Sequence, residues 1–554
     1  MHLSSFSSFR RLHFVLLTWL SWACVEHRAF ASPPVLRGQG SGTQLIVDGK
    51  PFLILGGELA NSSPSSLAQL EPAWARFQKM HLNTVVAPVS WELIEPVEGR
   101  FEFASVDGLI RQARGHGMRL VLLWFGSWKN SMSSYVPGWV KRDTARFPRA
   151  QLPTGAGLEI LSAFSESNLR ADVKAFTALM KHVRAIDAAR STVLMVQVEN
   201  EVGMLPTARE HGAEANARFA DTVPPALVDY LVAHESSLVP ALRAQWRANG
   251  AKKAGNWSAL FGTGAASEEV FTAWHLARYV DAVAAAGKAA YALPLYTNVA
   301  FNRPGKQPGE YPSGGPLPHL LDVWKAAAPS LDFLAPDIYF PNFAELASHY
   351  ARSDNPLFIP EANHARLPRA GADAFWAVGE HGALGFSPFS IDTLPEARAL
   401  RLTQAYGVLG ELAPTLLAAQ GQGRVRGFRP SVSYEGKVND APQTLKLGDF
   451  QFKVTFIDPW IPANEQQTIE HGGLLIQLGP EEYLAAGSGF VLEMVPVSAG
   501  PPIAGIESIW EGHFVAGRWT PGRLLNGDES HQGRHLRIPP DGFGIQRLKL
   551  YRYR

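Results

Sequence analysis

The chain has 554 residues, more than one compact core of usual size accommodates, so two or three domains are expected. Its composition, 46% hydrophobic and 18% charged, is that of an ordinary globular protein and excludes the disordered and fibrous classes. Lysine and arginine total 51 against 50 aspartates and glutamates, and this balance argues against nucleic acid or an anionic membrane as a partner and favours a neutral ligand.

Residues 1–31 have the features of a secretory signal: a basic start with two adjacent arginines, a short apolar run over 14–25, and an A-x-A cleavage site at 29–31. The apolar run is too short to span a bilayer, and an uncleaved membrane anchor or lipidation at Cys24 are the alternatives. Since Cys24 is the single cysteine, cleavage leaves a chain without disulfides. We therefore expect an exported protein, periplasmic or extracellular, that is free of the membrane after cleavage.

The region from residue 44 to residue 392 alternates short apolar runs with stretches of helical period, which is typical of a parallel α/β barrel. Most of the runs begin apolar and end polar, so functional groups are expected at the carboxyl ends of the strands. The eight candidate strands are 52–58, 83–91, 119–128, 193–201, 293–300, 331–340, 355–364 and 383–392. We predict an α/β fold, a (β/α)8 TIM barrel over residues 32–420.

Two further segments complete the predicted organisation. The stretch from 205 to 269 exceeds an ordinary connection and is expected to form a loop subdomain over the site. After residue 420 the pattern changes to short alternating runs broken by glycine, proline and asparagine, which predicts a C-terminal β-sandwich domain over 421–554. We expect this domain to brace the barrel and a possible homodimer; polysaccharide binding is the alternative.

Two of the predicted strands end in carboxylates. The motif QVENEVG (197–203) carries Glu199 and Glu201, which the period of two places on the same side, and FIPEANH (358–364) carries Glu361. By strand count these are strands four and seven, whose ends face each other across one pocket of a closed barrel. Retaining glycoside hydrolysis needs two carboxyl groups about 5 to 5.5 Å apart, so this pair indicates a glycosidase.

The segment VLMVQVENEVG resembles the signature of glycoside hydrolase family 35, and the pattern from residue 44 to about residue 415 resembles the clan of (β/α)8 retaining glycosidases. The resemblance implies that Glu201 is the acid/base and Glu361 the nucleophile. It also implies that Asn200 bonds the 2-hydroxyl of the sugar and that Tyr339 bonds the nucleophile. Such a mechanism needs Glu201 protonated near neutral pH while Glu361 is ionised.

Two motifs depart from the family pattern. In SWELIEPVEGRFEF (90–103), Trp91 is expected to form an apolar wall and Glu95 or Glu92 to meet hydroxyls, but the family commonly has W-N-x-H-E-P here. In LWFGSWKNSMSSYVPGWV (123–140), an unusual set replaces the asparagine/alanine/glutamate contacts of the family: Ser127, Trp128, Lys129 and Asn130. These departures indicate a divergent branch, similar to bacterial enzymes that remove terminal β-galactose from xyloglucan.

We therefore expect a retaining exo-β-galactosidase that hydrolyses terminal non-reducing β-D-galactosyl residues of plant cell-wall oligosaccharides. A family 42-like β-galactosidase and a non-catalytic carbohydrate-binding barrel are the alternatives. No cofactor or metal is expected, because His364 has no second histidine at ligand spacing. Tyr339, Trp91 and Trp128 also fit packed core positions, and Glu58 is able to reach the site. The expected substrate-binding residues are Asn200, Tyr339, Trp91, Glu92, Trp128, Lys129, Asn298 and His364.

Overall fold

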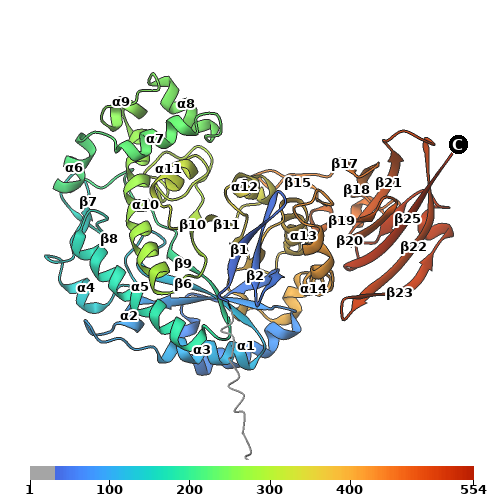
Figure 1. Ribbon diagram of the computed structural model, residues 1–554, viewed down its shortest axis with the longest axis horizontal. Helices are drawn as coiled ribbons and strands as arrows, with labels where there is room; N and C mark the ends of the chain where they lie inside the picture. The colour runs from blue at the N-terminus through green and yellow to red at the C-terminus, as the bar shows by residue number, and fades with distance from the viewer. Residues whose placement is uncertain (1–31) are drawn as a thin grey trace, which may run out of the picture.

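The computed structural model describes residues 32–554, and the predicted signal at 1–31 lies outside the described residues. Its centre is a closed barrel of parallel strands in the order β10-β11-β12-β13-β4-β5-β6-β9 (Figure 1). Each strand overlaps one of the eight predicted runs, which confirms the predicted fold class. The strands are β4 (Ile54–Glu58), β5 (Thr84–Ser90), β6 (Arg119–Lys129), β9 (Val193–Asn200), β10 (Leu295–Ala300), β11 (Phe333–Ile338), β12 (Ile359–Ala362) and β13 (Gly385–Pro388).

Helices surround the barrel (Figure 1), and several of them bury one apolar face. Helix α5 shows why such a segment forms a helix here. The side chain of Ser165 caps its first turn, and Leu179 and Val183 are buried on its inner face. Its neighbour α10 approaches so closely at Gly287 that a Cβ there would lie 2.2 Å from the ring of Phe176. The main helices are α1 (Leu67–Lys79), α3 (Ala104–Gly115), α5 (Glu166–Asp187), α10 (Ala265–Ala290), α11 (Leu321–Ala327), α12 (Phe343–Tyr350), α13 (Ala370–His381) and α14 (Leu400–Ala419).

The amino end of the barrel is closed by a small antiparallel sheet of β1 (Val35–Gln39), β2 (Gly42–Val47) and β3 (Lys50–Phe52). Leu45 and Val47 of β2 join the aliphatic and aromatic side chains that fill the barrel interior. Because apolar packing occupies this end, the polar ends of the strands at the opposite mouth are where a ligand meets functional groups.

The long connection between β9 and α10 contains four short helices: α6 (Ala213–Ala220), α7 (Pro225–Ala233), α8 (Pro240–Ala248) and α9 (Trp257–Phe261). Helix α9 packs on α10 and α7 packs on α11, so the helices extend the outer ring on one side of the barrel (Figure 1). The part of the connection nearest to the strand end is the segment after β9, where Met204 pairs with Ser313.

The C-terminal domain begins after α14, with β14 starting at Val425. A six-stranded sheet, β14-β19-β20-β25-β22-β23, and a four-stranded sheet, β17-β18-β21-β24, share one apolar core, as a β-sandwich requires. The strands are β14 (Val425–Phe428), β17 (Gln443–Leu447), β18 (Phe450–Thr455), β19 (Gly472–Gly479), β20 (Glu482–Ser488), β21 (Phe490–Pro496), β22 (Ile503–Val515), β23 (Arg518–Leu525), β24 (Leu536–Ile538) and β25 (Gly544–Tyr553).

The two domains meet where α13 packs against β14 and β19, and Glu380 of α13 pairs with Arg426 of β14 at 3.0 Å. Figure 1 shows the sandwich beside the barrel, next to α13 and α14. Within residues 32–554, no helix has the length and apolar character needed to cross a bilayer.

Candidate active site

Three carboxylates from separate strands meet at the mouth of the barrel. One side-chain oxygen from each of Glu201, Asp337 and Glu361 lies within 4.8 Å of the corresponding oxygens of the other two. All three side chains are almost fully buried, at 5%, 2% and 4% exposed. The two glutamates singled out from the sequence are therefore brought together, at a spacing close to the about 5 to 5.5 Å that a retaining glycosidase uses.

The backbone at the end of β9 is in the left-handed region, with φ of 61° at Glu199 and 45° at Glu201. These values are unfavourable for residues other than glycine and interrupt the alternation of a regular strand. The carboxylate of Glu199 accepts a hydrogen bond from the backbone N–H of Trp128 at 2.7 Å and lies beside Asp172 of α5. The prediction that Glu199 and Glu201 share one side was wrong, because the left-handed turn sends them to different surroundings.

Glu201 is held by neighbouring strands on both sides. Its backbone N–H donates to the side-chain oxygen of Asn298 on β10 at 2.8 Å, and the amide of Asn298 donates to Asp337 at 2.5 Å. The side-chain amide of Asn130, directly after β6, donates to Oε2 of Glu201. Asn298, predicted only as a substrate-binding residue, thus also links the acid/base candidate to the third carboxylate.

The hydroxyl of Tyr339, directly after β11, donates to Oε1 of Glu361. Burial and the charge on Glu361 raise the pKa of Tyr339, so the phenol stays protonated and remains a donor. The hydrogen bond from Tyr339 to Glu361 is the contact that the family resemblance implied. It orients the carboxylate that would attack the sugar.

The protonation states follow from burial and from the charges around the cluster. Burial, together with the charge on Glu361, raises the pKa of Glu201 to about 7, and Lys129 opposes the rise. Burial lowers the pKa of the Lys129 ammonium, but Glu361 and Glu201 outweigh it, so its pKa is raised. Burial first, and then the charge on Glu361, hold the pKa of Asp337 well above its usual range. A group with the pKa of Glu201 is suited to both donate and accept a proton at neutral pH.

Several buried polar atoms at the barrel mouth have no hydrogen-bond partner among the side chains and backbone of residues 32–554. They are both carboxylate oxygens of Glu58, both amide atoms of Asn200, Oδ1 of Asp337 and Oε2 of Glu361. Buried polar groups in proteins are nearly always hydrogen-bonded, so a cluster of unpaired ones indicates a ligand with many donors and acceptors. A sugar ring with its hydroxyls has that chemistry.

Two of the residues predicted to contact the sugar are tryptophans with fully buried side chains. Trp91 is 0% exposed and donates from its indole nitrogen to Glu95 at 3.0 Å. Trp128 is 1% exposed, donates to the carbonyl of Leu161 at 3.2 Å and packs on Tyr279. Both rings are enclosed, which fits the packed core positions that the sequence left open for them; a sugar contact of either ring stays a prediction.

Glu92 and His364 lie at the edge of the barrel mouth. The carboxylate of Glu92 forms a partly exposed ion pair with Lys141 at 3.0 Å. His364 is half-buried, and its Nδ1 lies 3.3 Å from the carbonyl oxygen of Phe389, whose ring packs on Tyr339. Lys129, in contrast, is 5% exposed and lies among the carboxylates.

Sequence reasoning did not assign Asp337, although a signal was present. The run ending in PDIYF places Asp337 two residues before Tyr339 near the end of a strand, where the period of two favours a shared side. The carboxylates of Glu201, Asp337 and Glu361 also have a spacing that suits a divalent cation. The buried Lys129 ammonium, however, already faces all three and supplies positive charge to the cluster.

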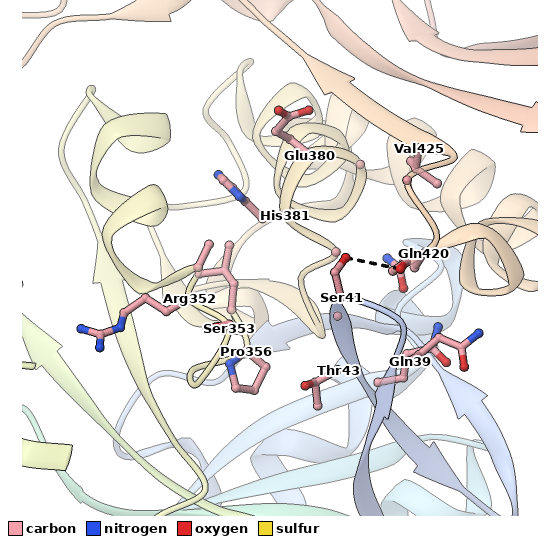
Figure 2. Close-up of a pocket in the computed structure, with 18 of the residues that line it drawn as sticks. Gln39, Ser41, Thr43, Arg352, Ser353, Pro356, Glu380, His381, Gln420 and Val425 are labelled. Atoms are coloured by element: carbon pink, nitrogen blue, oxygen red, sulfur yellow. Dashed lines mark hydrogen bonds between the residues drawn. The ribbon is translucent and has the colours of Figure 1, made fainter. Parts of the chain in front are cut away.

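A separate cavity of about 330 Å³ lies at the amino end of the barrel, between the β1–β2 hairpin and the loops that precede β12 and β13. In Figure 2 the side chains of Arg352 and Glu380 extend away from Ser41. Arg352 pairs with Asp322 at 2.8 Å and Glu380 pairs with Arg426, so the charged groups of this cavity are already engaged.

Two parts of the chain match known families. Residues 65–248 match the glycoside hydrolase family 42 model, described as β-galactosidase, and residues 402–537 match a domain of unknown function, DUF5597. The first match includes Lys129, Asn200 and Glu201 but ends before Glu361. It is to family 42, the alternative considered above, and does not support the expected assignment to family 35 specifically.

A β-galactosidase of Xanthomonas manihotis is 25% identical over 185 residues, which are 32% of this chain and 28% of that protein. The chain thus matches less than a third of the length of that relative. Among solved structures, β-galactosidase from Rahnella sp. R3 is 17% identical, with 69% of this chain and 58% of that chain covered and a TM-score of 0.44. For β-galactosidase from Bacillus circulans sp. alkalophilus the identity is 15%, the coverage 66% and 57%, and the TM-score 0.45.

Proposed function

We propose that the protein is a retaining exo-β-galactosidase in which Glu361 is the nucleophile and Glu201 the acid/base. The observation that carries the proposal is the convergence of these two buried carboxylates, with Asp337, to within 4.8 Å. Inverting enzymes place their carboxyl groups about 6.5 to 9.5 Å apart to leave room for a water molecule, so the short spacing favours a covalent route.

In the first step, an oxygen of Glu361 forms a bond to the anomeric carbon while the bond to the leaving oxygen breaks. The proton of Glu201 moves to that oxygen, and the aglycone departs. The product is a galactosyl ester on Glu361, and Glu201 is now the carboxylate. Tyr339 keeps Glu361 oriented for this attack through its hydrogen bond.

In the second step, Glu201 takes a proton from water as the water oxygen attacks the anomeric carbon. The ester bond breaks, galactose leaves with the configuration it had, and Glu361 regains its negative charge. The charge on Glu361 is one of the causes that raise the pKa of Glu201. Ester formation removes this charge, lowers the pKa of Glu201 and makes it a base at the right moment.

The galactosyl substrate is supported by the match of residues 65–248 to a β-galactosidase family and by the Xanthomonas relative. That match favours family 42, whereas the resemblance to family 35 depends on the ENE motif at 199–201 and on the glutamate at the end of the seventh strand. Terminal β-galactose of xyloglucan side chains is the natural substrate we propose, and the features at 1–31 support export as the route to it.

The direct test is release of nitrophenol from aryl β-galactoside, with aryl β-glucoside, β-mannoside and β-xyloside beside it and xyloglucan oligosaccharides afterwards. Glu361→Gln and Glu201→Gln are expected to lower kcat by at least about a thousandfold while the fold remains. Glu98→Gln is the matched control, because Glu98 is an exposed partner of Arg146. Proton NMR of the first-formed sugar anomer is expected to show retention. Wild-type turnover in Glu361→Gln would overturn the assignment.

A further inference from the structure

Glu58 is a buried acid for which the reaction described above has no role. It is the last residue of β4, the first strand of the barrel, and is 1% exposed. Neither of its carboxylate oxygens has a hydrogen-bond partner among the described residues. A carboxylate left ionised in such a place lacks both water and compensating donors, so a buried acid of this kind favours its neutral form.

The ionisable groups that face Glu58 come from several strands of the barrel mouth, and three of them are carboxyl groups against one ammonium. Glu361 on β12 contributes most by its charge, and it lies close enough for a hydrogen bond to Glu58 if one of the two acids carries a proton, whereas Lys129 on β6 is the cation that opposes it. The groups that interact with Glu58 among the described residues include Glu361, Glu201, Asp337, Lys129, Tyr296 and Tyr339. One ammonium cannot balance several ionised carboxylates in a space that is almost fully buried.

Burial, followed by the charge on Glu361, holds the pKa of Glu58 well above its usual range, and Lys129 opposes this only in part. Two carboxyl groups in contact cannot both ionise cheaply, so a proton is retained between them. If the proton stays on Glu58, its O–H can donate to Glu361, which lies within hydrogen-bonding reach, and the unpaired oxygens of the two acids become partners of each other.

We propose that Glu58 is held as the neutral carboxylic acid and donates a hydrogen bond to Glu361, which makes it a positioning residue for the nucleophile. The proposal rests on the proposed function, since it gives Glu361 the role of nucleophile. Tyr339 and Glu58 then hold the same carboxylate from β11 and β4, two different parts of the barrel. A carboxylate offers about four lone-pair sites, so two donors still leave about two free, one of which can attack.

The role predicts a specific effect on catalysis. A hydrogen bond to an ionised carboxylate is stronger than one to an ester oxygen, so the Glu58 donor stabilises Glu361 before attack and as a leaving group in the second step. Loss of the donor therefore lowers kcat more than it raises KM. The sugar ring itself need not touch Glu58 for this effect.

The test compares Glu58→Gln, which keeps a neutral donor of the same length, with Glu58→Leu, which keeps the volume but has no donor. With aryl β-galactoside, kcat of the glutamine variant is expected to exceed that of the leucine variant by about tenfold to a hundredfold, while KM differs by less than about threefold. Equal kcat in the two variants would overturn the proposal. Thermal unfolding of both variants checks that the comparison is between folded proteins.

A second measurement does not depend on turnover. Infrared difference spectra between wild type and Glu58→Gln at neutral pH are expected to show the loss of one carbonyl band of a protonated carboxylic acid. In the Glu361→Gln background the charge that raises the pKa of Glu58 is gone, so this band is expected to disappear at a lower pH than in wild type. Absence of the difference band would overturn the proposal. An inactive wild type that still showed the band would refute the proposed function alone.

Discussion

The side-chain oxygen of Asn298 accepts the backbone N–H of Glu201 at 2.8 Å, and the amide of Asn298 donates to Asp337 at 2.5 Å. One buried amide on β10 thus fixes the backbone of the acid/base candidate and the third carboxylate. This matters because Glu201 has φ of 45°, a conformation that persists only when the surroundings hold it. The position of the Glu201 carboxyl group is therefore set by a contact between strands.

Asn298→Ala is expected to lower kcat/KM by about tenfold to a hundredfold, because it leaves two buried groups without a partner, each at a cost of about 1 to 3 kcal/mol. Steady-state kinetics and thermal unfolding of the variant measure the two effects. Asn298→Ser keeps a smaller hydroxyl partner and should fall between alanine and wild type. A variant with unchanged kcat/KM would show that Asn298 does not hold Glu201 in place.

The pH dependence of kcat/KM should show a fall above about pH 7. Burial and the charge on Glu361 raise the pKa of Glu201 to about 7, and the first step requires its protonated form. The raised pKa means that the acid is present below this value and is lost as the pH rises through it, so kcat/KM falls about tenfold per pH unit beyond. Glu201→Gln, assayed with an activated aryl galactoside that needs no protonation, should lack this limb. A limb that stays in place in that variant belongs to another group.

Lys129→Met should move the alkaline limb to higher pH. The Lys129 ammonium lowers the pKa of Glu201, so its removal raises that pKa and extends the protonated form upward. The maximal rate is expected to fall as well, since the ionised nucleophile loses its nearby cation. Lys129→Arg, which keeps the positive charge, is the control and should leave the limb near its original pH. A limb shifted to lower pH in the methionine variant would contradict this electrostatic account.

Metal removal is expected to leave activity unchanged. The oxygens of Glu201, Asp337 and Glu361 have a spacing that a divalent cation would accept, but Lys129 lies among these groups. Dialysis against EDTA followed by kinetics with aryl β-galactoside checks this, with added Mg²⁺ and Ca²⁺ as the comparison. Loss of activity on chelation and its return with either ion would assign the cluster to metal binding.

The barrel could be predicted from the sequence because its signals are local. Each predicted strand is a short apolar run, and most of these runs end in polar residues. Stretches with apolar residues at three- and four-residue spacing separate the runs and indicate helices. All eight predicted runs overlap observed strands of the barrel. Convergence of Glu201 and Glu361 then follows from closure of the barrel, which brings the ends of the fourth and seventh strands to one mouth.

The parts that could not be predicted depend on tertiary contacts. The left-handed turn at Glu199 and Glu201 arises where neighbouring strands hold the backbone, so the period of two was misleading there. Trp91 and Trp128 are at positions where an exposed ring and a buried one look alike in sequence, and only packing shows that both are enclosed. The role of β2 in closing the amino end depends on Leu45 entering the barrel interior.

The most direct test of the central claim is to trap the covalent intermediate. A 2-deoxy-2-fluoro-β-galactoside with a good leaving group should inactivate the enzyme with time, and mass spectrometry of the digested protein should find the fluorosugar esterified to Glu361. This result is predicted because Glu361 lies beside Glu201 with one oxygen oriented by Tyr339. A label on another residue, or turnover with inversion and no label, would contradict the account.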